Sequence, residues 1–259
     1  AAMAAFARER ALRLRPHAKT HKSAWIAQAQ IAHGAVGVCV QKTSEAEALA
    51  ARGVRNLFIS NEVIDEHKLA RVAALAREVT LAIAVDSVLG IERLAAALQS
   101  AGSTLEVFVE IDVGQGRCGA PPREAARLAR AVIEQGLHLA GLQAYHGAAQ
   151  HLRSGAERRA AIGASAQAVR EALAALAAAG IDCPLVTGAG SGSFVLEAES
   201  GLWGELQCGS YLFMDRDYAD NDALPGAPRF EHALFVKSQV VSRSADHAVI
   251  DAGHKSHAI

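Results

Sequence analysis

The chain has 259 residues, 51% of them hydrophobic and 5% aromatic, and its 26 basic and 27 acidic residues give a net charge of −1. This length fits one large α/β barrel or two ordinary domains, and the balanced charge gives no sign of the basic surface that binds nucleic acid or anionic membranes. There is no run of 18 apolar residues and no signal-peptide pattern, so we expect neither a membrane span nor secretion.

Apolar or β-branched runs alternate with amphipathic helical patterns along most of the chain. We expect strands at 14–21, 36–41, 56–60, 80–86, 105–113, 139–146, 184–188 and 205–211. Helical patterns lie between them, most clearly at 24–33, 44–52, 62–77, 87–100, 122–135 and 154–179. This rhythm predicts an α/β fold, a (β/α)8 TIM barrel over residues 1–215. An open parallel sheet is the alternative, because periodicity does not distinguish the two.

The pattern changes after the eighth expected strand. Residues 215–229 are rich in Asp, Ala, Pro and Gly, which is typical of a loop. Residues 232–242 and 247–251 then resemble consecutive strands with no helix between them. We therefore expect residues 230–259 to be the truncated beginning of an antiparallel β domain, and the chain to be a fragment of a longer protein.

A basic run in the first expected strand is the most informative local feature. Period-two alternation would place Arg15, His17, Lys19 and His21 on one face. A lysine among other cationic groups has its ammonium form disfavoured, which makes Lys19 a candidate amine nucleophile for a carbonyl compound. The alternative is a solvated basic edge strand.

Polar residues also follow the fifth, sixth and seventh expected strands, where barrel enzymes collect their catalytic groups. These are Arg117, Tyr145 with His146, and the glycine-rich turn Gly190, Ser191, Gly192 and Ser193. Backbone N–H groups and hydroxyls of that turn are suited to a phosphate, although such a turn is more often only a loop. We assign no metal role to His151, His254 or His257, because none has a helical i,i+4 partner.

Together these groups form the set that pyridoxal phosphate requires. The set comprises an amine nucleophile, a phosphate cradle, an arginine and an aromatic or imidazole face. The four cysteines, Cys39, Cys118, Cys183 and Cys208, show neither a C-x-x-C pair nor zinc-site spacing. We therefore expect free thiols and a cytoplasmic location.

With these residues in view, the sequence resembles the alanine-racemase-like (fold type III) pyridoxal phosphate enzymes, and within them the D-threonine aldolase, 3-hydroxy-D-aspartate aldolase and D-serine dehydratase branch. The resemblance is carried, in order along the chain, by residues 15–22, 112–119, 143–147, 188–193 and 208–215. Residues 251–256 also resemble the tail of 3-hydroxyaspartate aldolases.

The resemblance implies roles for individual residues. Lys19 would form the Schiff base, with His17 and His21 tuning it or relaying protons, and Arg117 would bind the ring oxygen of the cofactor. Its phosphate would be bound by the turn at Gly190, Ser191, Gly192 and Ser193 and by Ser210 and Tyr211. The family further implies a homodimer in which the partner completes each site. It also implies a divalent metal (Mn or Mg), whose ligands we expect beyond Ile259.

The expected reaction is retro-aldol cleavage of a D-configured β-hydroxy-α-amino acid, of the 3-hydroxyaspartate or D-threonine type, to glycine and an aldehyde. One alternative keeps the cofactor but performs β-elimination, as in D-serine dehydratase, or racemisation. A second alternative is a pyridoxal phosphate-binding protein without catalysis. The strands expected after residue 230 argue against this second alternative, because such proteins end with the barrel.

Overall fold

The computed structural model describes residues 1–253. Eight parallel strands form one sheet in the order β1-β8-β7-β6-β5-β4-β3-β2. They are β1 (Arg13–Leu14), β2 (Val38–Val40), β3 (Asn56–Ile59), β4 (Thr80–Val85), β5 (Glu106–Glu110), β6 (His138–Ala144), β7 (Val186–Gly188) and β8 (Glu205–Leu206).

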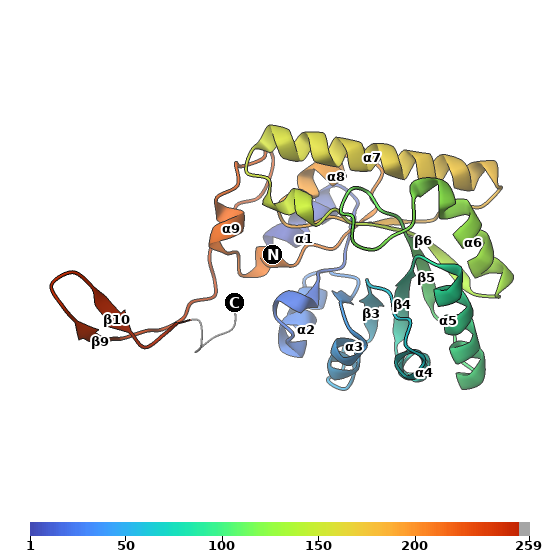
Figure 1. Ribbon diagram of the computed structural model, residues 1–259, viewed down its shortest axis with the longest axis horizontal. Coiled ribbons are helices and arrows are strands. Elements are labelled where there is room, and N and C mark those ends of the chain that lie inside the picture. Colours follow the sequence, from blue (N-terminus) through green and yellow to red (C-terminus); the bar gives the residue numbers. More distant parts are fainter. Residues whose placement is uncertain (254–259) are drawn as a thin grey trace.

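Helices connect successive strands and cover the outside of the sheet (Figure 1). The α-helices are α1 (Ala2–Glu9), α2 (Ala24–Ala32), α3 (Thr43–Ala50), α4 (Glu66–Leu75), α5 (Val88–Ala101), α6 (Ala125–Glu134), α7 (Gly155–Ala178), α8 (Phe194–Ser200) and α9 (Arg216–Ala219). Short 3₁₀ helices are η1 (Ala18–Thr20), η2 (Pro122–Glu124), η3 (Ala148–His151) and η4 (Ser210–Leu212). None of the helices in residues 1–253 combines the length and apolar character needed to cross a membrane.

The first and last barrel strands pair with each other, which curls the sheet. Arg13 pairs with Glu205 and Leu14 with Leu206 in parallel register. On the other side of β1, the amide of Cys39 donates to the carbonyl of Pro16 at 2.9 Å, and His17 and Cys39 form a parallel bridge. These bonds join β1 to both neighbours, and the predicted α/β barrel is confirmed.

Strand alternation separates an inner from an outer apolar layer. Phe58, Ala82, Ala84 and Phe108 belong to a small cluster inside the barrel, where the two phenylalanine rings lie 4.8 Å apart. Their strand neighbours point the other way and pack with the helices in the main core. Because strands of a parallel barrel are buried on both faces, they appear in the sequence as continuous apolar runs.

A buried ion pair lies inside the barrel. Arg15 Nε lies 3.0 Å from Glu205 Oε1, and the side chains are 3% and 0% exposed. Arg15 also donates to the side chain of Asn56, and the Thr187 hydroxyl donates to Glu205 at 2.9 Å. The alternative of a solvated basic strand is therefore wrong for Arg15, whose charge is neutralised inside the barrel.

The prediction of a strand through residue 21 is wrong beyond His17. The amide of His17 still bonds the carbonyl of Cys208, but Ala18–Thr20 form the 3₁₀ helix η1. The His17 side chain caps this turn, its Nδ1 accepting from the Lys19 amide at 3.3 Å. Lys19 therefore projects from a turn at the barrel rim and does not share a strand face with Arg15.

The helix expected from residue 62 begins four residues later. Asp65 Oδ1 accepts from the Lys68 amide at 2.9 Å and caps α4 at its start, as an N-cap carboxylate does. Glu62 consequently lies in the loop after β3. Gly102 ends α5 with φ of +62°, in the left-handed conformation that glycine adopts readily.

Beyond α9 the chain leaves the barrel as an extended segment that ends in a projecting hairpin (Figure 1). The hairpin consists of β9 (Val240–Arg243) and β10 (Ala248–Ile250), paired antiparallel. The strand expected at 232–242 thus forms only from Val240. The motif at 251–256 extends into residues 254–259, which lie outside the described residues.

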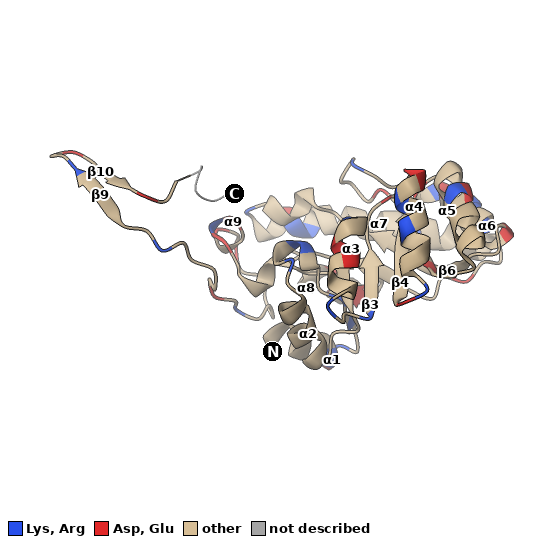
Figure 2. Cartoon of the chain, turned by 90° about the horizontal axis from the view of Figure 1, so that it is seen from below, with Lys and Arg blue, Asp and Glu red and all other residues tan. Residues whose placement is uncertain are grey.

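Charges of both signs are mixed over the helical surface. Figure 2 shows Lys and Arg interspersed with Asp and Glu along α4 and α5. Several are paired, such as Arg71 with Glu47 and Arg93 with Glu66. Opposite charges therefore lie close together on these helices.

We predict that Gly141→Ala destabilises the barrel. Gly141 has φ of +146°, and a Cβ there would lie 1.8 Å from the carbonyl oxygen of Leu185 in the segment before β7. The substitution should lower the free energy of unfolding by about 2 kcal/mol or more, measured by urea denaturation. Gly163→Ala is the control, because that position is in α7 with nothing within 4 Å, and it should be neutral or stabilising. Equal stability of both variants would contradict the steric argument.

Candidate active site

A cavity of about 180 Å³ lies at the carboxyl ends of the barrel strands. Residues after β1, β2, β3, β5, β6, β7 and β8 contribute to its walls, as expected for a parallel barrel. The lining residues are His17, Lys19, Thr20, Gln41, Ser60, Arg117, Gln143, Tyr145, His151, Ala189, Gly190, Ser191, Gln207, Gly209, Ser210 and Tyr218.

Several polar wall residues were missed in the sequence analysis. Gln41 and Ser60 stand one residue beyond the ends of β2 and β3, and Gln143 and Gln207 lie near the ends of β6 and β8. Gln207 Nε2 donates to Gln143 Oε1 at 2.7 Å. Strand alternation could have identified two of them. Gln41 and Ser60 lie two residues after Cys39 and Phe58, which face the barrel interior, so their side chains are expected on the same inner face.

Lys19 projects into this cavity from η1. Its Nζ lies 5.8 Å from the centroid of the Tyr145 ring. The cavity walls partly remove water from the ammonium group, and this desolvation, followed by the charge of Arg117, lowers the pKa of Lys19. Lys22, by contrast, pairs with Glu45 at 3.0 Å on the exposed surface. Lys19 is therefore the amine of this run that is prepared for nucleophilic chemistry.

The His17 side chain holds the backbone of the turn that carries Lys19. It is 7% exposed, and burial, then the charge of Lys19, holds its pKa well below the usual value. Because Nδ1 accepts from the Lys19 amide, the ring proton belongs on Nε2, which lies 3.2 Å from Ser60 Oγ. A neutral His17 thus fixes the turn that carries Lys19.

Two glycines on the far wall pack closely against neighbouring protein atoms. A Cβ at Gly209 would lie 2.7 Å from Thr20 Oγ1, and one at Gly190 would lie 2.3 Å from Gln150 Oε1. Ser191 Oγ accepts from the amide of Tyr211 at 2.8 Å, which joins the loops after β7 and β8. Glycine backbone and serine hydroxyls on adjoining loops suit a phosphate group.

The neighbouring turn residues point away from the cavity. Ser193 is fully buried and accepts from Gln150 Nε2 at 2.7 Å while donating to Glu197 Oε1 at 2.8 Å. The Gly192 amide donates to Gln150 Oε1. Burial raises the pKa of Glu197 to about 7. Gly192 and Ser193 therefore hold the loop in shape and do not line the cavity.

Three further predicted residues also lie off the cavity wall. His146 Nδ1 lies 3.1 Å from Ser165 Oγ on α7. His21 Nδ1 accepts from the Ser23 amide at 3.0 Å. Tyr211 accepts from Gln30 Nε2 at 2.9 Å. The side chain of His146 thus contacts α7, that of His21 contacts the start of α2, and that of Tyr211 contacts α2 itself.

Arg117 enters the cavity from the loop after β5. Its side chain is 38% exposed, and Nη2 lies 3.8 Å from Oε1 of the buried Glu110. Arg117 is thus held at one end and presents a charge beside Lys19, which its effect on the pKa of Lys19 reflects. A planar donor in this position suits a phenolate or carboxylate oxygen.

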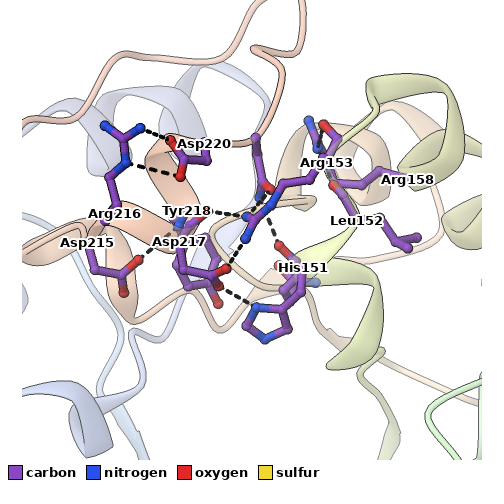
Figure 3. Close-up of polar contacts among 11 residues, drawn as sticks. His151, Leu152, Arg153, Arg158, Asp215, Arg216, Asp217, Tyr218 and Asp220 are labelled. Carbon is purple, nitrogen blue, oxygen red and sulfur yellow. Dashed lines mark hydrogen bonds and ion pairs between the residues drawn. The ribbon is translucent and has the colours of Figure 1, made fainter. Parts of the chain in front are cut away.

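His151, to which the sequence analysis assigned no metal role, lines the cavity. Its Nδ1 lies 2.5 Å from Asp217 Oδ2, which also pairs with Arg153. Figure 3 shows these groups linking η3 to α9, where Tyr218 closes the same side of the cavity. Because Asp217 occupies Nδ1, the Nε2 atom of His151 is the free acceptor. No short-range pattern predicts this pair, whose members are 66 residues apart.

Comparisons with known proteins show which family this chain belongs to. The family model "Alanine racemase, N-terminal domain" matches residues 2–217. D-threonine aldolase from Arthrobacter sp is 43% identical over 98% of this chain and 68% of its own length. 3-Hydroxy-D-aspartate aldolase from Paracoccus denitrificans (strain Pd 1222) is 41% identical over 99% of this chain and 69% of its own.

A solved structure extends the similarity to the fold. The crystal structure of D-threonine aldolase from Filomicrobium marinum superposes with a TM-score of 0.97 at 47% identity, covering 100% of this chain and 71% of that one. The resemblance found in the sequence is thereby confirmed. The chain belongs to the alanine racemase N-terminal domain family, and within it is similar to D-threonine and 3-hydroxy-D-aspartate aldolases.

Proposed function

We propose that this chain forms the cofactor-binding barrel of a pyridoxal phosphate-dependent aldolase, which cleaves D-configured β-hydroxy-α-amino acids to glycine and an aldehyde. The observation that carries the proposal is Lys19, an amine of lowered pKa in a cavity shared with Arg117 and a glycine–serine wall. The similarity to two D-specific aldolases supports the choice of reaction.

The residues present fit the cofactor. The Lys19 amine would bind its aldehyde and Arg117 its ring oxygen, while Ser191, Ser210 and the backbone at Gly209 would bind its phosphate. The support is the donor set of the cavity, whose lining includes Ser191, Gly209 and Ser210. When bound, pyridoxal phosphate supplies the electron sink for the electrons of the broken Cα–Cβ bond.

His151 would move the proton that starts the cleavage. Its Nε2 takes the proton of the substrate β-hydroxyl, and Asp217 orients the ring and stabilises its charged form through Nδ1. Arg153 holds Asp217 in place through a second ion pair. The buried His17, whose pKa is held low, keeps the Lys19 turn in position.

Other expectations stay predictions. These are the homodimer that the family implies, the cytoplasmic location, and the division into a barrel at 1–215 and a partial β domain at 230–259. The divalent metal also stays a prediction, because its ligands are expected beyond Ile259.

Product analysis separates the proposal from β-elimination and racemisation. With D-threonine or 3-hydroxyaspartate, glycine with acetaldehyde or glyoxylate supports aldol cleavage. Release of ammonia and an α-keto acid would show that the reaction is dehydration. Formation of the amino acid with the opposite configuration at Cα would show that it is racemisation. Absence of any turnover by a protein that shows cofactor absorbance would favour a binding protein.

Lys19→Ala should abolish the absorbance of the cofactor–lysine adduct and with it all turnover. Lys22→Ala is the matched control, because Lys22 pairs with Glu45 on the surface, and both properties should persist there. A cofactor spectrum unchanged in Lys19→Ala would remove Lys19 from the proposal.

Lys19 should also react at lower pH than an ordinary lysine. Burial and Arg117 lower its pKa from 10.5, so its neutral amine is populated at lower pH. Labelling with a small amine-specific reagent, followed by mass spectrometry across pH, should place the half-reaction point of Lys19 below that value. Arg117→Ala should move the point upward, because a repelling charge is lost, whereas Arg123→Ala should leave it in place. An unmoved point in Arg117→Ala would contradict the assigned cause.

His151→Asn should reduce kcat by about 100-fold or more while leaving the cofactor spectrum intact. Asp217→Asn should reduce kcat as well, because the ring loses its oriented tautomer. His67→Asn, on the exposed face of α4, serves as the control. Wild-type kcat in His151→Asn would exclude this histidine as the proton acceptor.

A further inference from the structure

A second group of reactive side chains lies at the barrel rim behind Arg117. Glu62 follows β3, Asp86 follows β4, and Cys118 lies in the loop after β5. Because these strands are neighbours in the sheet, their carboxyl ends bring the three side chains together. One ligand atom from each lies within 4.8 Å of the other two.

A buried carboxylate outside this trio faces it. Glu110, the last residue of β5, is 3% exposed, and its Oε2 has no hydrogen-bond partner among the described residues. It interacts with both Glu62 and Asp86, and burial, followed by Glu62, raises the pKa of Glu110 to about 9. Both carboxylate oxygens of Glu62 are likewise buried without a partner in the described part of the chain.

The neighbouring Arg117 does not form a hydrogen bond with Glu110. Arg117 Nη2 lies 3.8 Å from Glu110 Oε1, beyond hydrogen-bond distance. Leaving buried carboxylate oxygens unpaired costs several kcal/mol. A divalent cation between Glu62, Asp86 and Cys118 would supply the partner that these carboxylate oxygens lack among the described residues.

We propose that Glu62, Asp86 and Cys118 bind one divalent transition-metal cation. Two carboxylate oxygens and one sulfur suit a cation of intermediate softness, such as Zn²⁺ or Co²⁺, better than Mg²⁺ or Ca²⁺. The Cys118 thiol would release its proton to the solvent when the cation binds. This site contains no histidine and lies within the barrel.

Bound there, the cation would also act on the neighbouring cavity. Its positive charge would be added near Glu110, the carboxyl group that Arg117 Nη2 approaches at 3.8 Å on the cavity wall. The site itself does not depend on the proposed aldolase activity, since its ligands are defined without substrate or cofactor.

Cobalt is the probe, because Co²⁺ bound to a thiolate absorbs in the near ultraviolet. The whole chain, treated with chelator and free of pyridoxal phosphate, is titrated with Co²⁺. We expect a thiolate-to-cobalt band that saturates at one equivalent. Cys118→Ser should abolish the band, whereas Cys183→Ser, a half-buried thiol before β7, should retain it.

Affinity and stability give a second readout. Glu62→Gln should weaken Co²⁺ binding on the order of 10-fold or more, while Glu66→Gln, on exposed α4, should bind as the wild type does. Co²⁺ should raise the thermal midpoint of the wild type more than that of Glu62→Gln. A wild-type protein without the band, or a band that survives Cys118→Ser, would overturn the proposal and leave Glu62 and Glu110 as a carboxyl pair sharing a proton.

Discussion

The buried pair of Arg15 and Glu205 is the interaction on which the rest of the barrel depends. Removing two such charges from water costs several kcal/mol for each ion, and the cost is offset only when further hydrogen bonds are made. Asn56 and Thr187 make these bonds, and Arg13 approaches the second oxygen of Glu205 at 3.1 Å. The pair therefore ties β1 to β8, β7 and β3 at once, and it closes the barrel immediately below the cavity.

Above this pair, the electrostatics of the site follow from burial. Desolvation lowers the pKa values of His17 and Lys19, which are cationic when protonated, and raises those of Glu110 and Glu197, which are anionic when deprotonated. All four shifts favour neutral side chains near the rim. Arg117 lies beside Lys19, and its charge is the second cause, after burial, of the lowered pKa of the lysine.

Much of the fold was predictable from the sequence, because parallel strands buried on both faces leave unmistakable apolar runs separated by helices. The local errors have physical causes. Alternation does not reveal that the His17 side chain caps a 3₁₀ turn, so the face assigned to Lys19 was wrong. In the turn after β7, Ser193 forms hydrogen bonds with Glu197 and Gln150, whereas Ser191 lines the cavity. The composition of the turn does not distinguish these two serines. His151 escaped notice because its partner Asp217 is distant in sequence and meets it only in the folded chain.

The pairing of β1 with β8 has a consequence for how the cavity comes into being. Lys19 and Thr20 stand on one side of that seam and Gly209 and Ser210 on the other, about as far apart in sequence as the barrel allows. Local contacts form early in folding and such distant ones late. A chain folded only as far as β7 would hold most of the sheet yet have no wall opposite Lys19. Any ligand that spans the seam therefore binds only the completed barrel, and its binding energy adds directly to the cost of opening the molecule between its first and last strands.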